Sequence, residues 1–88
     1  MSEEQSALQF PCYFPIKAMG ITSSELDIQI VQIIRRHVPD IQEGAVTSKL
    51  SRNGKYTSIT VTIRASSKQQ LDAIYQDLSD VPEVLVAL

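Results

Sequence analysis

The sequence predicts a small α+β domain in which strands and helices follow the order β-α-β-β-α-β. Two segments repeat apolar residues at the 3.6-residue period of a helix, and others alternate apolar and polar residues as strands do. Asn53-Gly54 stands between two of the alternating segments and is the strongest short signal for a hairpin. The 88 residues suffice for one domain with one modest core. We expect a flexible acidic tail over residues 1–9 and a single domain over residues 10–88.

The first strand is predicted over residues 13–19. Pro11 and Pro15 exclude a helix here and suit either an extended edge or the entry to a strand. Gly20 is expected to end the strand. Because successive side chains point to opposite faces of a strand, we expect Phe14, Ile16 and Ala18 on one face, and Tyr13, Lys17 and Met19 on the other.

A helix is predicted next, from about Thr22 to His37. Thr22 and Glu25 have the spacing of a capping box, which marks a helix start. Basic residues fill the last turn, where they favour the negative end of the helix dipole, and Pro39 stops the helix. The apolar stripe of this helix consists of Leu26, Ile28, Ile30, Val31, Ile33, Ile34 and His37.

Two further strands are predicted over residues 45–52 and 55–65. They flank Asn53-Gly54, for which we expect a type I′ turn with positive φ at both residues. The second of these strands alternates cleanly, which places one face on the core and leaves the other to water or a partner. The expected outward residues are Ser58, Thr60, Thr62 and Arg64.

Residues 66–70 open a second helix, and residues 83–88 form the last strand. The apolar stripe of the helix consists of Leu71, Ile74, Tyr75 and Leu78. Right-handed connections then place both helices on the same face of a four-stranded antiparallel sheet, which is the ferredoxin-like arrangement.

Composition excludes several classes of protein. The net charge is −2, with 8 basic and 10 acidic residues, which argues against nucleic acid as the main partner. No apolar run approaches the roughly 18 residues of a membrane span, so we expect no membrane association. The acidic first residues are unlike a signal peptide, and a single cysteine suits a reducing compartment, so a cytoplasmic location is expected.

Few residues can carry catalysis. One histidine and one cysteine cannot build a zinc site, and no nucleophile-elbow, P-loop or dinucleotide motif is present. Cys12 and His37 remain as a candidate catalytic pair. A packed cysteine and a histidine that ends a helix explain both residues more simply. We therefore expect a protein that is not an enzyme and uses no metal or cofactor.

The turn after the first strand is a candidate ligand site. Gly20 would let the backbone approach a ligand closely. Thr22, Ser23 and Ser24 expose amide groups at a helix N-terminus, which can accept a carboxylate or another anion. Ordinary helix capping is the alternative interpretation.

The sheet face away from the helices is a candidate interaction face. It mixes aromatic, apolar and hydroxyl groups. Interfaces are enriched in tyrosine, methionine and arginine, although lysine is depleted, so the face suits a protein partner or a second copy of the chain. A solvated face is the alternative, and weak RNA binding is another, although Ser58 and Thr60 occupy positions where aromatic stacking residues would be needed. The expected residues are Tyr13, Lys17, Met19, Lys49, Tyr56, Ser58 and Arg64.

Several short motifs occur together in this chain: Phe10-Pro11, Phe14, Lys17, Met19-Gly20, His37 with Pro39, and residues 51–58. Their combination resembles the YbeD-like family of small uncharacterised bacterial proteins over residues 10–88. The resemblance implies an ACT-like fold. ACT domains bind small effectors, often amino acids, near the first strand–helix turn and at dimer interfaces, so the resemblance points to Gly20 and its neighbours. Genes of the family are often found beside lipoate-attachment genes.

Together these observations predict a cytoplasmic bacterial module that binds without catalysing. It would act as a regulatory or adaptor protein that senses a small metabolite or docks a protein partner, with a link to lipoate metabolism implied by the resemblance. A weak RNA-binding protein that uses the open sheet face is the alternative.

Overall fold

The computed structural model describes residues 9–88, so the expected tail lies outside the described residues except for its last position. The element order is the predicted β-α-β-β-α-β, with one short 3-10 turn, η1, added before the second strand. The elements are β1 (Cys12–Ile21), α2 (Leu26–Arg35), η1 (Glu43–Ala45), β2 (Val46–Leu50), β3 (Tyr56–Ala65), α3 (Lys68–Ser79) and β4 (Val84–Ala87).

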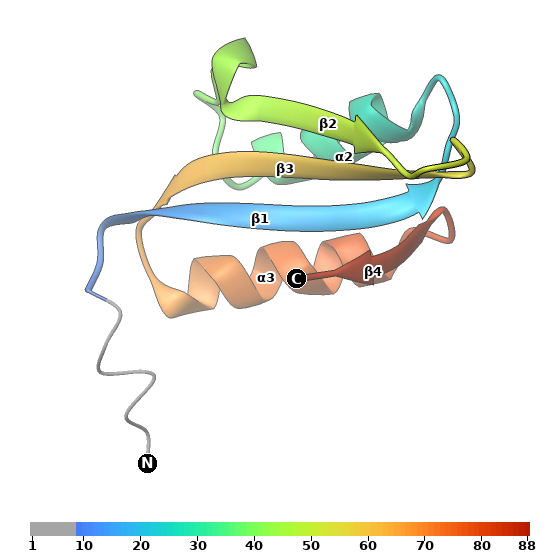
Figure 1. The fold of residues 1–88 in the computed structure, drawn as a ribbon. Helices are drawn as coiled ribbons and strands as arrows, with labels where there is room; N and C mark the ends of the chain where they lie inside the picture. The colour runs from blue at the N-terminus through green and yellow to red at the C-terminus, as the bar shows by residue number, and fades with distance from the viewer. Residues whose placement is uncertain (1–8) are drawn as a thin grey trace.

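The four strands form one antiparallel sheet in the order β2-β3-β1-β4 (Figure 1). The two central strands, β1 and β3, pair along their whole length, from Cys12 opposite Ala65 to Ile21 opposite Tyr56. Both helices cover one face, with α2 behind β2 and β3 in Figure 1 and α3 beside β1 and β4. The α+β, ferredoxin-like prediction is confirmed.

The core lies between the sheet and the helices. Alternate residues of β1 and β3 enter it, including Ile16, Ile59 and Val61, which are at most 1% exposed. The apolar stripes of both helices close it from the other side. Their buried members are Leu26, Ile30, Ile33, Ile34, Leu71, Ile74 and Leu78.

The first strand does not end at Gly20, contrary to the prediction. β1 continues to Ile21, and Gly20 is a buried strand residue that pairs with Val84 of β4. The pairing between β1 and β4 shifts register between Met19 and Gly20, which brings the backbone of Glu83 close. A Cβ at Gly20 would overlap the carbonyl oxygen of Glu83, so a glycine is needed here for packing.

The predicted capping box of the first helix is wrong. α2 begins at Leu26, and no side chain caps it. The hydroxyl of Thr22 is instead hydrogen-bonded to that of Thr57 on β3, at 2.8 Å, and the Thr22 amide donates to the carbonyl of Lys55. The helix ends at Arg35, two residues earlier than predicted, and His37 lies in the turn that follows.

The hairpin between β2 and β3 also differs from the prediction. Only Gly54 has a positive φ, of 76°, and Asn53 does not, so the turn is not type I′. The Gly54 amide donates to the carbonyl of Ser51, and the Asn53 side-chain oxygen accepts from the Lys55 amide at 3.0 Å. The Ser51 hydroxyl accepts from the Tyr56 amide at 3.1 Å. The connection is therefore a longer loop tied together by its own side chains.

The second helix begins as predicted. Ser67 caps α3 by accepting from the amide of Gln70 at 3.0 Å, and the Gln70 side chain accepts in return from the amide of Ser66 at 2.8 Å. Within residues 9–88, neither helix is long and apolar enough to cross a membrane.

The last strand covers only part of β1. Lys17 and Leu88 exchange both of their backbone hydrogen bonds, at 2.9 and 2.7 Å, and the pairing runs from there to Gly20. Within the described part of the chain, residues 12–16 of β1 therefore have a strand on the β3 side alone.

Candidate functional site

The face of the sheet opposite the helices, called here the open face, brings together side chains from all four strands. The register defines its rows, because residues paired across antiparallel strands point to the same face. All seven residues predicted for the interaction face lie on it. Its rows are Lys49, Ser58, Met19 and Val86; Thr47, Thr60, Lys17 and Leu88; Thr62 and Pro15; Arg64 and Tyr13; and Tyr56 and Ile21.

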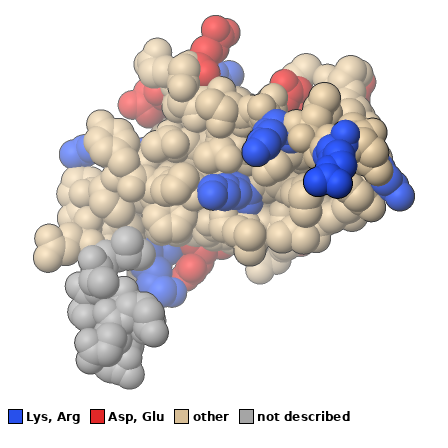
Figure 2. Space-filling view, in the orientation of Figure 1, with Lys and Arg blue, Asp and Glu red and all other residues tan. Residues whose placement is uncertain are grey.

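Charge is strongly segregated between this face and the rest of the chain. Lys17, Lys49 and Arg64 lie on the open face, and Arg52 and Lys55 lie in the hairpin loop beside it. None of the described strands contains an Asp or Glu. Figure 2 shows this face with Lys and Arg across it and Asp and Glu at its margins. A protein of net charge −2 thus presents one cationic face.

An apolar hollow lies on the open face where β1 meets β4. Its volume is about 100 Å³, and its walls are almost entirely apolar. Met19, Val86 and Leu88 are 36%, 41% and 72% exposed, so three of the side chains that line the hollow are accessible to solvent. The hollow is lined by Lys17, Ala18, Met19, Ser58, Val86 and Leu88.

Sequence reasoning missed Val86 and Leu88. Val86 lies on β4 and Leu88 directly follows it. The register of β4 against β1 is shifted by a bulge, and no local pattern in the sequence reports that shift. The apolar run over residues 84–88 predicts a strand but not which neighbour each residue meets.

The two open-face tyrosines do not form a stacking platform. Tyr13 is 76% exposed and lies opposite Arg64, whereas Tyr56 lies at the other end of β3. Eight residues of extended strand separate Arg64 from Tyr56, a distance of about 27 Å at roughly 3.4 Å per residue. The ammonium of Lys55 also lies 5.4 Å from the centre of the Tyr56 ring, as in a cation–π contact.

The predicted ligand turn lies on the other side of the sheet. Thr22, Ser23 and Ser24 line a second hollow, of about 250 Å³, while Gly20 is buried away from it. Asp27 also lines it, and one of its oxygens accepts from the Ile28 amide at 2.8 Å. These carboxylate surroundings do not favour an anion.

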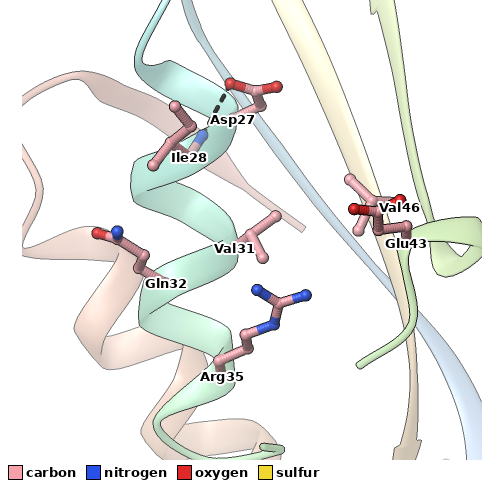
Figure 3. Close-up of a pocket in the computed structure, with 7 residues that line it drawn as sticks. All are labelled: Asp27, Ile28, Val31, Gln32, Arg35, Glu43 and Val46. Atoms are coloured by element: carbon pink, nitrogen blue, oxygen red, sulfur yellow. Dashed lines mark hydrogen bonds between the residues drawn. The ribbon is translucent and has the colours of Figure 1, made fainter. Parts of the chain in front are cut away.

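A groove runs between α2 and the segment that leads into β2 (Figure 3). Its volume is about 370 Å³. Figure 3 shows Val31 and Arg35 reaching from α2 towards Glu43 and Val46 across the groove. Arg35 also donates to the carbonyl of Ile41 at 3.2 Å. The groove mixes charges of both signs with apolar residues and contains no pairing of a nucleophile with a base.

The candidate catalytic pair has structural surroundings. Cys12 is partly buried against the core at the start of β1. His37 Nε2 lies 2.7 Å from a carboxylate oxygen of Asp77, which ties the end of α2 to α3, and Gln70 donates to the His37 carbonyl. Within residues 9–88, no cluster of three or more His, Cys, Asp or Glu side chains is placed to hold a metal ion.

Known proteins place the chain in a family. The sequence profile described as "Protein of unknown function (DUF493)" matches residues 5–88. The UPF0250 protein of Nitrosomonas europaea is 40% identical over 85 residues, which cover 97% of this chain and 98% of that protein. The UPF0250 protein of Chromobacterium violaceum is 41% identical over 86 residues, with 98% and 97% coverage.

Two solved structures share the fold. Protein HP0495 from H. pylori aligns with a TM-score of 0.75 and 18% identity, over 93% of this chain and 86% of that one. The uncharacterized protein TM1266 from Thermotoga maritima aligns with a TM-score of 0.61 and 10% identity, over 86% and 92%. The YbeD-like resemblance is confirmed, and the chain belongs to the DUF493 (UPF0250) family of small bacterial proteins of unknown function.

Proposed function

We propose that this protein is a non-catalytic adaptor or regulatory module of the bacterial cytoplasm, and that it docks a protein partner on its open face. One observation carries the proposal: exposed apolar and cationic side chains gather on a face whose described strands contain no Asp or Glu, in a protein of net negative charge. Exposed Tyr, Met and Arg are the residue types that protein interfaces enrich. The lipoate link implied by the family makes proteins of that pathway the first partners to test.

A second copy of the chain fits the open face poorly. In a two-fold dimer each patch meets itself, so Lys17, Lys49 and Arg64 of one copy would approach the same residues of the other. Like charges facing one another in an interface are unfavourable. The open face therefore favours a different protein of complementary charge.

RNA is also a weaker candidate. Single-stranded RNA is bound by stacking successive bases on neighbouring aromatic rings. On the open face Ser58 and Thr60 occupy the middle of β3, and the two tyrosines lie at its opposite ends. The cations remain as non-specific phosphate contacts alone.

A small-metabolite sensor is a second candidate, favoured by the hydroxyl-lined hollow at the first turn. Five hydroxyls and one carboxylate surround its 250 Å³, a volume just below the roughly 300 Å³ of ordinary ligand sites. A thermal-shift screen against amino acids, nucleotides and lipoate-pathway metabolites tests it. A ligand at about 100 times its Kd stabilises the fold by roughly 2.7 kcal/mol, which raises Tm by about 10 °C or more.

The docking proposal is tested by affinity capture followed by binding to the purified captured protein. We expect Lys17→Glu/Arg64→Glu to weaken binding at least tenfold. A matched control, Arg36→Glu/Lys68→Glu, makes the same change in net charge on the helix side and should bind like the wild type. Equal binding by all three proteins would show that the open face is not the docking surface.

A further inference from the structure

We infer that the partner contributes an acidic segment with one aliphatic side chain, and that this side chain enters the apolar hollow on the open face. The inference rests on the proposed docking function and names the chemistry of the partner. It is carried by the position of the hollow among the cations of the open face.

The hollow is sized for an aliphatic side chain. A dry cavity of about 150 Å³ accommodates benzene, so the hollow, at about 100 Å³, suits a leucine, isoleucine or valine better than an aromatic ring. Its walls are almost entirely apolar, although Lys17 and Ser58 are among the residues that line it, so they offer little to a polar group. Water in the hollow makes few hydrogen bonds to its walls, so replacing this water by an aliphatic group lowers the free energy.

The surroundings of the hollow are cationic. Lys17 lines the hollow itself. Lys49 lies in the same row as Met19, two strands away, which is about 10 Å at roughly 4.8 Å per strand. A purely apolar partner would remove water from these ammonium groups without replacing its hydrogen bonds, so carboxylates beside the aliphatic group are needed.

The distance from the hollow to Lys49 limits the spacing in the partner. In an extended chain alternate side chains point the same way, and they are about 7 Å apart at roughly 3.4 Å per residue. A carboxylate two positions before the aliphatic residue would meet Lys17, and one two positions after it would reach Lys49 through the length of the two side chains. The inferred motif is therefore a branched aliphatic residue with acidic residues two positions away on either side.

The inference is tested by titrating the full-length, isotope-labelled protein with synthetic peptides and following its amide NMR signals. The first peptide has the sequence Glu-Ser-Leu-Ser-Glu, the second replaces its leucine by serine, and the third replaces both glutamates by lysine. We expect the first peptide to shift the amides of Lys17, Met19, Ser58 and Val86, and each of the other two to bind at least tenfold more weakly.

Two variants make the test specific. Met19→Glu places a carboxylate at the hollow and should abolish binding of the first peptide. Ile28→Glu changes an aliphatic residue of α2 that is 53% exposed, and it should leave binding of the first peptide unchanged. The inference fails if the serine peptide binds as tightly as the leucine peptide, if the shifts map to the helices, or if no peptide shifts any signal at millimolar concentration.

The outcomes separate the inference from the proposed function. A captured partner that needs Lys17 and Arg64 but tolerates Met19→Glu would overturn the inference and leave docking on the open face in place. A short oligouridine that shifts the same amides more strongly than the acidic peptide would overturn both, because the face would then bind phosphate chains rather than a protein.

Discussion

Gly20 shows how a backbone contact can explain a glycine that the sequence suggests for ligand binding. The residue is buried in β1, and the space of a side chain is taken by the carbonyl oxygen of Glu83. The neighbouring atom belongs to the backbone and cannot rotate away. The bulged pairing of β1 with β4 is therefore a sufficient physical reason for a glycine at position 20, whether or not the adjacent turn binds a ligand.

Gly20→Ala should lower the free energy of unfolding by about 1–3 kcal/mol, because the added methyl group overpacks the β1–β4 pairing. Gly44→Ala is the matched control, since nothing lies within 4 Å of the Cβ it would add. Urea denaturation of the three proteins measures the difference. Equal midpoints for Gly20→Ala and the wild type would show that β4 moves aside freely.

Tyr75 should make stability sensitive to alkaline pH. Burial raises the pKa of its phenol above the ordinary value of 10.0, because the charged form is poorly solvated. The folded state thus holds the phenolic proton more tightly than the unfolded state. This contribution is complete below pH 10 and is lost as pH rises through the folded-state pKa.

The free energy of unfolding of Tyr75→Phe should therefore fall less than that of the wild type between pH 9 and pH 11, which is about one unit on either side of the ordinary phenol pKa. Chemical denaturation across that range measures it, and Tyr13→Phe, at an exposed tyrosine, controls for a general effect of removing a phenol. Parallel stability curves for the wild type and Tyr75→Phe would contradict the expectation.

The two helix starts show which elements the sequence can predict. Ser67 caps α3 through an amide three residues away, so the signal is local and the prediction is correct. Thr22 has the same spacing to Glu25, but its hydroxyl is bonded to Thr57, 35 residues further along the chain. The sheet decides its partner, and a capping motif read in isolation cannot include that competition.

Ser67→Ala should lower the free energy of unfolding by about 1 kcal/mol, since the amide of Gln70 loses its acceptor at the first turn of α3. Ser67→Asp keeps an acceptor and adds a charge that the helix dipole favours, so it should retain stability. Thermal unfolding compares the three proteins. A loss with Ser67→Asp as large as with Ser67→Ala would argue against the cap.

The hairpin between β2 and β3 was likewise predictable in its position but not in its detailed geometry. Asn53-Gly54 correctly predicts that two strands meet there, because glycine supplies the positive φ. The turn type was not predictable, since the side chains of Ser51 and Asn53 bond backbone amides of the loop and lengthen it. For the same reason β2 ends at Leu50 rather than at the predicted residue 52, and β3 begins at Tyr56 rather than at residue 55.

At the scale of the whole molecule, the sequence predicts layers better than it predicts sites. Alternation in β1 and β3 is enough to assign six of the seven predicted open-face residues to one face, and Lys49 lies on β2. It does not place Val86 and Leu88 beside Met19, because that depends on a register shift between strands at opposite ends of the chain. The apolar hollow was therefore invisible in the sequence, while the cations around it were not.

Charge segregation gives a prediction for the intact protein. Although its isoelectric point is about 5.2, the protein should be retained by a cation exchanger at pH 7 and low salt, through the open face. Retention should disappear near 0.15 M salt, where the Debye length falls to about 8 Å. Chromatography of Lys17→Glu/Lys49→Glu should show no retention, whereas Arg36→Glu/Lys68→Glu, with the same net charge, should behave as the wild type. Identical elution of the two variants would mean that the overall charge alone governs retention.

The incomplete cover of β1 by β4 has a consequence for self-assembly. Lys17 directs its amide and carbonyl towards Leu88, on the side of β1 away from β3. Alternate residues of a strand direct their backbone groups to the same side, so those of Pro15 and Tyr13 point to the part of this side that no described strand covers. Pro15 has no amide proton to offer there, yet it breaks no bond to β3, which lies on the other side. A strand arriving from another molecule would find a missing donor in the middle of the uncovered stretch. The proline thus limits fibril-like growth at the place where the sheet is open to it.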